Sequence, residues 1–406
     1  MLFFTLYCRI FQFCFGLGSR LLPWRQPKRI DGCGSLSTIP TLLVENGARN
    51  PLIVTGPRLI KAPFWNALFS ELQPHNLSYS VFSDCRPDPT VSSIEAIVRQ
   101  YRDDGCDCII AVGGGSNLDA AKAAAARIVR PNRTLAQLGG LLKVRKRLPL
   151  FLAVPTTAGT GSETTIAAVV TDDTTHRKYA ISDLCLIPHY AILDPQLTVS
   201  LPPAVTAATG MDALTHAIEA YLGWAYNTKE TRRLAEEAVV AIFQYLERAY
   251  RDGSDLEARS ALLTASFQAG VAFTRASVGN VHAIAHTLGG LYGIPHGLAN
   301  AVVLPIVLED YGAAAEKKLA RLAELTDCKQ DGTDAEKAQA LIAAIHAMNR
   351  RMGIPRHLDC LQPDDFPKMA AWAGKEANPL YPVPVIYDEK RLISILEKVQ
   401  GGMTSP

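Results

Sequence analysis

The first half of the chain alternates short apolar runs with stretches of helical periodicity. Apolar runs typical of buried strands stand at residues 51–55, 78–82, 108–112 and 148–154. Between them, apolar side chains recur at helical spacing over residues 62–72, 90–102 and 117–128. Strands that alternate with helices indicate a parallel sheet with crossover helices. An α/β fold with a Rossmann-like, nucleotide-binding sheet is therefore expected over residues 10–201.

The second half of the chain shows a different pattern. Beyond Pro202 no strand pattern appears, and helical periodicity is bounded by glycine and proline breaks. Helices are expected at residues 231–251, 256–272, 312–325, 335–351 and 388–399. Residues 202–406 therefore form a predicted all-helical domain.

The N-terminal segment is aromatic and apolar over residues 1–15. Alternation at residues 10–15 predicts a strand, and residues 1–9 are expected to be either a start-site artefact or a disordered extension. Arg9 interrupts the apolar run and no basic residue precedes it, so neither a signal peptide nor a spanning helix is expected.

Composition narrows the class of protein. The chain has 48% hydrophobic and 20% charged residues and a formal net charge of +2, without long runs of like charge. Neither nucleic acid nor a membrane is therefore an expected partner. The nine cysteines are scattered, which fits a reducing cytoplasm better than a disulfide framework.

A glycine triplet, Gly113-Gly114-Gly115, follows the apolar run at 108–112 and precedes Ser116 at the start of a predicted helix. Bare backbone lets a phosphate approach the amide groups, and the helix dipole favours the negative charge. The alternative is a tight turn alone. The motif departs from G-x-G-x-x-G, the common dinucleotide fingerprint.

A second polar segment, P-T-T-A-G-T-G-S-E, follows the apolar run at 148–154. Small hydroxyl side chains and glycines at a strand end can bind a dinucleotide closely, and the alternative is a Ser/Thr-rich turn.

Three of the nine histidines stand in N-V-H-A-I-A-H-T-L-G-G-L-Y-G-I-P-H-G, an otherwise apolar segment. His282 and His286 share a helical face, Gly289-Gly290 is expected to end that helix, and His296 follows in a loop. Asp212 and His216 have the same spacing upstream. One carboxylate and three imidazoles suit a divalent cation with an open position for substrate. The alternative is a set of core histidines satisfied by hydrogen bonds.

G-M-D-A-L-T-H-A-I-E-A-Y, together with the histidine segment, resembles the iron-containing (group III) alcohol dehydrogenase family. The resemblance implies Asp212, His216, His282 and His296 as metal ligands and His286 as a catalytic residue in the substrate pocket. It implies Fe(II), and the ligand chemistry accepts zinc as well.

The resemblance also implies a cofactor site. Its expected residues are Asp88, Gly114, Gly115, Ser116, Asp119, Thr156, Thr157, Thr160, Thr165 and Lys178. Gly56, with Arg58 nearby, occupies a place where a carboxylate would favour NAD, so tolerance of NADP is expected. Asp119 could instead complement the helix dipole.

The sequence thus predicts a metal-dependent, NAD(P)-linked alcohol dehydrogenase or aldehyde reductase for small primary alcohols, forming a homodimer or higher homo-oligomer. Alternatives are a dehydroquinate synthase-like or glycerol (phosphate) dehydrogenase-type enzyme on the same fold, a metal hydrolase, and a non-catalytic nucleotide-binding protein.

Overall fold

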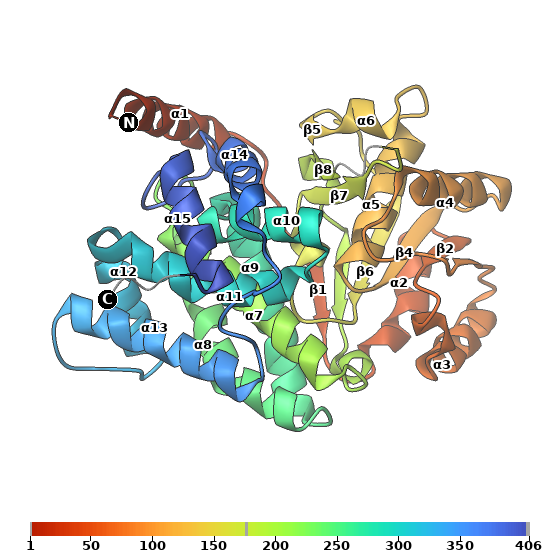
Figure 1. The fold of residues 1–406 in the computed structure, drawn as a ribbon. Coiled ribbons are helices and arrows are strands. Elements are labelled where there is room, and N and C mark those ends of the chain that lie inside the picture. Colours follow the sequence, from red (N-terminus) through yellow and green to blue (C-terminus); the bar gives the residue numbers. More distant parts are fainter. Residues whose placement is uncertain (1, 175–177, 403–406) are drawn as a thin grey trace. The chain divides into compact units, whose positions relative to one another are not determined.

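The computed structural model describes residues 2–174 and 178–402. The chain divides into two compact units. The α/β unit comprises Pro23–Ser200, and the helical unit comprises Leu201–Pro406 together with Met1–Leu22 (Figure 1). Residues 10–22 were expected in the α/β domain but group with the helical unit.

A six-stranded parallel sheet forms the centre of the α/β unit, with strand order β1-β9-β6-β4-β2-β3. Its strands are β1 (Lys28–Asp31), β2 (Pro51–Val54), β3 (Ser80–Phe82), β4 (Cys108–Gly113), β6 (Leu150–Pro155) and β9 (Tyr190–Leu193). The parallel sheet predicted from the sequence is confirmed. A smaller sheet, in the order β5-β8-β7, was not predicted. It contains β5 (Gly140–Leu141), β7 (Ala167–Thr171) and β8 (Lys178–Ser182).

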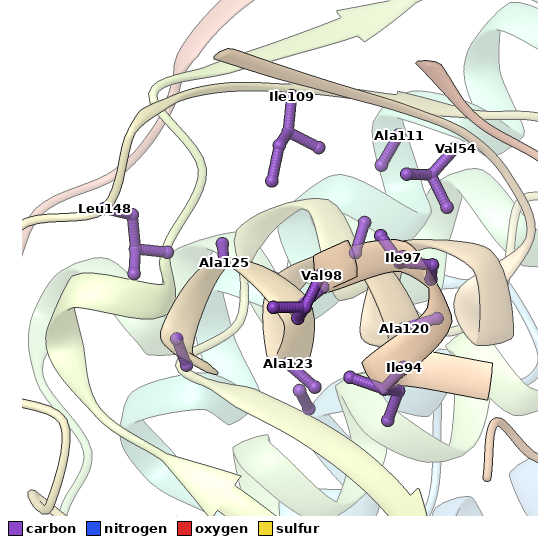
Figure 2. Close-up of a cluster of buried hydrophobic side chains, with 14 of the residues drawn as sticks. Val54, Ile94, Ile97, Val98, Ile109, Ala111, Ala120, Ala123, Ala125 and Leu148 are labelled. Atoms are coloured by element: carbon purple, nitrogen blue, oxygen red, sulfur yellow. The ribbon is translucent and has the colours of Figure 1, made fainter. Parts of the chain in front are cut away.

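Three helices of the α/β unit lie where the alternating pattern predicted them: α3 (Phe64–Leu72), α4 (Val91–Asp103) and α5 (Gly115–Val129). Two further helices, α2 (Ile39–Glu45) and α6 (Leu135–Leu138), were not predicted. Figure 2 shows Ile94, Ile97 and Val98 of α4 in one buried cluster with alanines of α5. Alanine lets α5 pack closely, because it adds little volume between helix and sheet.

The described residues of the helical unit beyond Leu201 contain no strand. Its helices are α1 (Leu2–Ser19), α7 (Pro203–Leu222), α8 (Lys229–Arg251), α9 (Leu256–Ala276), α10 (Asn280–Tyr292), α11 (His296–Tyr311), α12 (Glu316–Leu325), α13 (Asp334–Arg351), α14 (Phe366–Ala377) and α15 (Glu389–Gln400). Residues 210–222 of α7 are all buried, so α7 is the central helix of this unit.

Short 3₁₀ segments complete the described structure. They are Ser35–Thr38, Leu59–Lys61, Gln73–His75, Ser162–Thr164, Leu184–Leu186, Pro195–Thr198, Gly312–Ala314 and Pro363–Asp365.

The structure corrects three predictions about local conformation. Residues 10–15 are helical within α1, and the strand prediction was wrong because an almost uniformly apolar run does not define a period. Gly289-Gly290 does not end α10, which continues to Tyr292 and stops at Gly293 with φ 65°. His296 is the first residue of α11, with Pro295 as the N-cap, and does not lie in a loop.

One helix among the described residues, α1, is long and apolar enough to cross a membrane by length and composition. Only 22% of its 18-residue window is buried.

Candidate metal centre and cofactor-binding segments

Asp212, His216, His282 and His296 converge within the helical unit. One potential ligand atom from each side chain lies within 4.8 Å of those of the others. Oδ1 of Asp212 is 3.7 Å from Nε2 of His282 and 3.3 Å from Nε2 of His296. The i, i+4 spacing on α7 places Asp212 and His216 on one face, while α10 and α11 supply the two other histidines. The four residues that the family resemblance implied are therefore close together.

The protonation of three members of this cluster, Asp212, His216 and His296, suits a cation. Burial alone would raise the pKa of Asp212, but His216 and His296 bring that pKa well below its usual value. Burial lowers the pKa of His216 well below its usual value and also lowers the pKa of His296. An ionised carboxylate and neutral imidazoles are the forms that bind metals.

Burial also acts against a charge on His282, but its hydrogen bonds to Asp212 and Glu219 raise its pKa to about 9. Glu219 is buried on α7, and its Oε2 lies 2.6 Å from Nδ1 of His282. Its carboxylate also accepts hydrogen bonds from the backbone N–H groups of Gly279 and Val281. A carboxylate on the second ring nitrogen fixes the orientation of a ligating histidine. Sequence reasoning missed Glu219, although it stands seven residues after Asp212 on the same helix.

Two buried polar atoms at the cluster lack partners within the described parts of the chain. They are Nδ1 of His216, which faces Asp212 at 3.9 Å, and Oδ1 of Asn300. The Asn300 amide nitrogen donates to Asp212 at 2.7 Å and lies 3.2 Å from both His282 and His296. A buried imidazole nitrogen without a partner is costly, so the donor set fits a bound divalent cation.

His286 lies beside this cluster, and its side chain is 43% exposed. Its ring stacks on His296 at a centroid distance of 5.2 Å. Nδ1 of His286 lies 2.6 Å from Oε1 of Glu376, which also accepts the hydroxyl of Tyr381 at 2.8 Å. Burial would raise the pKa of Glu376, but His286 and Tyr381 lower it below the usual value. Phe273 stacks on His216 at 4.1 Å and so lines the cluster.

The two polar segments of the α/β unit lie against each other. Gly113 ends β4, Gly114 is the N-cap of α5, and Gly115 begins that helix. A Cβ on Gly115 would lie 2.6 Å from the Thr160 side chain, and one on Gly114 would lie 3.4 Å from Thr157. Gly115 therefore permits a close approach between the two segments. The N–H of Thr156 donates to the Gly113 carbonyl at 3.0 Å.

Asp119 and Lys122 of α5 form hydrogen bonds with the second polar segment, residues 155–163, and with the residues that follow it. Asp119 accepts the Ser162 hydroxyl at 2.6 Å and the Val169 backbone N–H at 3.0 Å. The buried Lys122 ammonium donates to the Ser162 carbonyl and to the carbonyl and hydroxyl of Thr165. Burial lowers the pKa of Lys122 to about 8. All three donors of the ammonium are therefore used within the protein.

The sequence profile described as iron-containing alcohol dehydrogenase matches residues 27–195, and the C-terminal profile of the same family matches residues 206–400. The chain belongs to the iron-containing alcohol dehydrogenase family. It is 36% identical to alcohol dehydrogenase 4 of Schizosaccharomyces pombe, with 89% of this chain and 85% of that protein covered. It is 39% identical to 1,3-propanediol dehydrogenase of Klebsiella pneumoniae, with 82% and 87% covered.

Solved structures show the same family fold. A 1,3-propanediol oxidoreductase superposes with a TM-score of 0.89 at 34% identity, and the match covers 93% of this chain and 100% of that protein. An alcohol dehydrogenase from Oenococcus oeni gives 0.88 at 31% identity, covering 93% and 99%. The protein is thus an oxidoreductase, an iron-containing, nicotinamide-dependent alcohol dehydrogenase. These matches favour that prediction over the synthase-like, hydrolase and non-catalytic alternatives.

The remaining residues that the family resemblance implied are dispersed along the α/β unit. Asp88 and Lys178 pair with each other, with Oδ1 and Nζ 2.7 Å apart. Ser116 lies in the first turn of α5. Gly56 follows β2, and a Cβ there would meet the Cys85 carbonyl at 3.1 Å.

Proposed function

We propose that Asp212, His216, His282 and His296 hold the divalent cation of this alcohol dehydrogenase. The convergence of these four side chains, three of them buried, is the observation that carries the proposal. Iron is the ion that the family name implies, and one carboxylate with three imidazoles would accept zinc as well. When bound, the cation acts as a Lewis acid that stabilises negative charge on the oxygen of the alcohol or aldehyde.

His286 is proposed as the catalytic residue that exchanges a proton with the substrate or solvent. Because Nδ1 of His286 is hydrogen-bonded to Glu376, Nε2 is the ring atom that exchanges the proton. Tyr381 and Glu376 fix the ring, while Glu219 fixes His282. The 43% exposure of the His286 side chain gives this proton a route to solvent.

The cofactor is proposed to bind along the two adjoining segments of the α/β unit. Backbone amides at Gly114, Gly115 and Ser116 would hold the pyrophosphate at the start of α5. The hydroxyl side chains proposed to line the cofactor are those of Thr156, Thr157 and Thr160. Because Asp119 and Thr165 are engaged within the protein, they would support this site by holding its second segment in place. Asp88 and Lys178 are proposed at the edge of the cofactor site.

Tolerance of NADP is proposed because position 56 is a glycine, so no carboxylate there repels the 2′-phosphate of NADP. The nearby Arg58 is proposed to attract that phosphate. Catalytic efficiency with NADH and NADPH tests this proposal. A preference for NADH of about a hundredfold, or about 2.7 kcal/mol, would contradict it. Arg58→Ala should raise the KM for NADPH and leave the KM for NADH unchanged.

A small primary alcohol or aldehyde is the proposed substrate, and a cytoplasmic homodimer or higher homo-oligomer is the proposed state. The family supports the substrate class, and nine free cysteines support a reducing compartment. Light scattering of the purified protein measures the oligomeric state, and a monomer at working concentration would contradict that part.

The decisive experiment for the metal site combines metal analysis with aldehyde reduction in a His216→Ala variant. This variant should lose metal and activity but still bind NADH, because the proposed cofactor residues lie in the other unit. His346→Ala is the matched control, since His346 is a histidine of the same unit that pairs with Glu309 away from the cluster. Full metal content and activity in His216→Ala would disprove the ligand role.

A further inference from the structure

Two side chains of helix α1 bind the backbone of residues 379–384, the anchored segment, which belongs to the same compact unit. The Gln12 amide nitrogen donates to the Pro379 carbonyl at 3.1 Å and to the Tyr381 carbonyl at 2.7 Å. The Arg9 guanidinium donates to two further carbonyls of the segment at 2.7 and 2.8 Å. The position of this backbone therefore depends on α1.

The Gln12 side chain is fully buried, and every polar atom of its amide is engaged. Its nitrogen donates twice to the anchored segment, while its oxygen accepts from Arg9 at 3.0 Å and from the Trp224 indole N–H at 2.9 Å. This pattern fixes the orientation of the amide, because the carbonyls require N–H donors and the two donors require an oxygen. A buried polar group satisfied in this way holds its partners in one arrangement.

The anchored segment also reaches the residues beside the metal cluster. The Tyr381 hydroxyl donates to Oε1 of Glu376 at 2.8 Å, and the same oxygen lies 2.6 Å from Nδ1 of His286. The His286 ring in turn stacks on His296, one of the four clustered side chains. A continuous series of hydrogen bonds therefore runs from Gln12 through Tyr381 and Glu376 to His286.

We propose that Gln12 is a positioning residue for His286 and acts through the Tyr381 backbone and the Glu376 carboxylate. The inference rests on the proposed role of His286 in proton exchange. By fixing the Tyr381 carbonyl, Gln12 determines where the Tyr381 hydroxyl meets Glu376, and this carboxylate orients the His286 ring. A small displacement of a catalytic group slows the chemical step, so Gln12 should contribute to turnover although it lies on α1.

The substitution Gln12→Glu, made in the whole chain with its metal bound, tests this inference. A glutamate keeps an oxygen acceptor for Arg9 and Trp224 but lacks the two N–H donors to the carbonyls of Pro379 and Tyr381. The kcat for alcohol oxidation should fall about 3- to 10-fold, while the KM for the alcohol and the metal content stay unchanged. A role confined to the packing of α1 would lower the thermal unfolding midpoint without this selective loss of kcat.

Gln400→Glu is the matched control. The Gln400 amide donates to the Leu361 carbonyl at 2.9 Å, in the same unit but outside the anchored segment, so this substitution should leave kcat unchanged. Gln12→Leu is the second variant, which removes both donors without adding a charge and should lower kcat in the same direction. It keeps the inference testable if a buried carboxylate at position 12 prevents folding, and circular dichroism shows whether each variant is folded.

A double-mutant cycle with Glu376→Gln examines the route from Gln12 to His286. In the Glu376→Gln background, Gln12→Glu should cause no further loss of kcat, because both substitutions act on His286 through the same carboxylate. An equal loss of kcat in both backgrounds, or wild-type kcat in both folded Gln12 variants, would overturn the inference and leave the role of His286 intact. Wild-type kcat in His286→Ala would instead disprove the proposed function of His286, and the inference with it.

Discussion

Nδ1 of the buried His282 lies 2.6 Å from the Glu219 carboxylate, and the two residues come from different helices. This carboxylate orients the ring so that Nε2 faces Asp212. Glu219→Gln should therefore weaken metal binding by about 10- to 100-fold. The measurement is the metal retained after dialysis against increasing concentrations of a chelator.

Glu309→Gln is the matched control for this substitution. It removes a carboxylate 3.1 Å from His346, a histidine away from the cluster, and should leave metal content unchanged. Wild-type metal retention in Glu219→Gln would show that His282 does not depend on this hydrogen bond for its position.

Gly297 provides a second test, because it directly follows His296 at the start of α11. A Cβ at position 297 would lie 2.2 Å from the Ala208 carbonyl oxygen of α7, so Gly297→Ala must move α11 relative to α7. The expected cost is about 1–3 kcal/mol of stability, with a loss of metal affinity because the two helices carry ligands of the same centre. Thermal unfolding and metal analysis measure both effects.

Gly290→Ala is the control for Gly297→Ala, since a Cβ at Gly290 meets no described atom within 4 Å. In the helical context of α10 it should stabilise the protein by about 0.5–1 kcal/mol. If both variants have the same stability and the same metal affinity, the contact with Ala208 does not explain why position 297 requires glycine.

The hydrogen bond between His286 and Glu376 predicts an effect on turnover. Glu376→Gln removes the charge that holds Nδ1 of His286, and kcat should fall by about 10- to 100-fold while metal content stays constant. Tyr381→Phe removes one hydrogen bond to the same carboxylate and should have a smaller effect in the same direction. Unchanged kcat with a raised KM for the alcohol would instead indicate a role in substrate binding alone.

Glu163 predicts a dependence of stability on pH. Burial raises the pKa of this carboxyl from its ordinary value near 4.5 to about 7. The folded protein therefore keeps this proton longer than the unfolded chain does. The resulting stability is fully present below about pH 4.5 and is lost as pH rises through about 7.

Glu163→Gln should remove that dependence, because an amide stays neutral. Relative to the wild type, the free energy of unfolding of the variant should rise by up to about 3 kcal/mol between pH 5 and pH 8. Unfolding midpoints across this range give the comparison, with the exposed Glu45→Gln as control. Parallel curves for the wild type and Glu163→Gln would contradict the prediction.

The sequence predicted the parallel sheet and the all-helical second half because their periodicities are regular and their breaks are marked by glycine and proline. The grouping of Asp212 with His216, and of His282 with His286, followed from i, i+4 spacing on helices. That Asp212, His216 and His282 converge with His296 depends on how α7, α10 and α11 pack, and only the family resemblance indicated it. Glu219 was missed because its partner, His282, lies 63 residues away in sequence.

The strand predicted at residues 10–15 shows where periodicity fails. When nearly every position is apolar, alternation and helical spacing fit equally well, and the few polar residues carry the information. Arg9 and Gln12 stand three apart, which suits one helical face. Asp119 and Thr165 illustrate another limit, since sequence alone could not show that internal hydrogen bonds already engage both side chains.

The position of α1 has a consequence for biosynthesis. Arg9 and Gln12 of this helix are synthesised 367 to 375 residues before the backbone carbonyls that accept their hydrogen bonds. At typical elongation rates of about 5–20 residues per second, residues 379–384 are synthesised on the order of tens of seconds after α1. Throughout that interval the growing polypeptide displays an apolar N-terminal helix to chaperones and targeting factors.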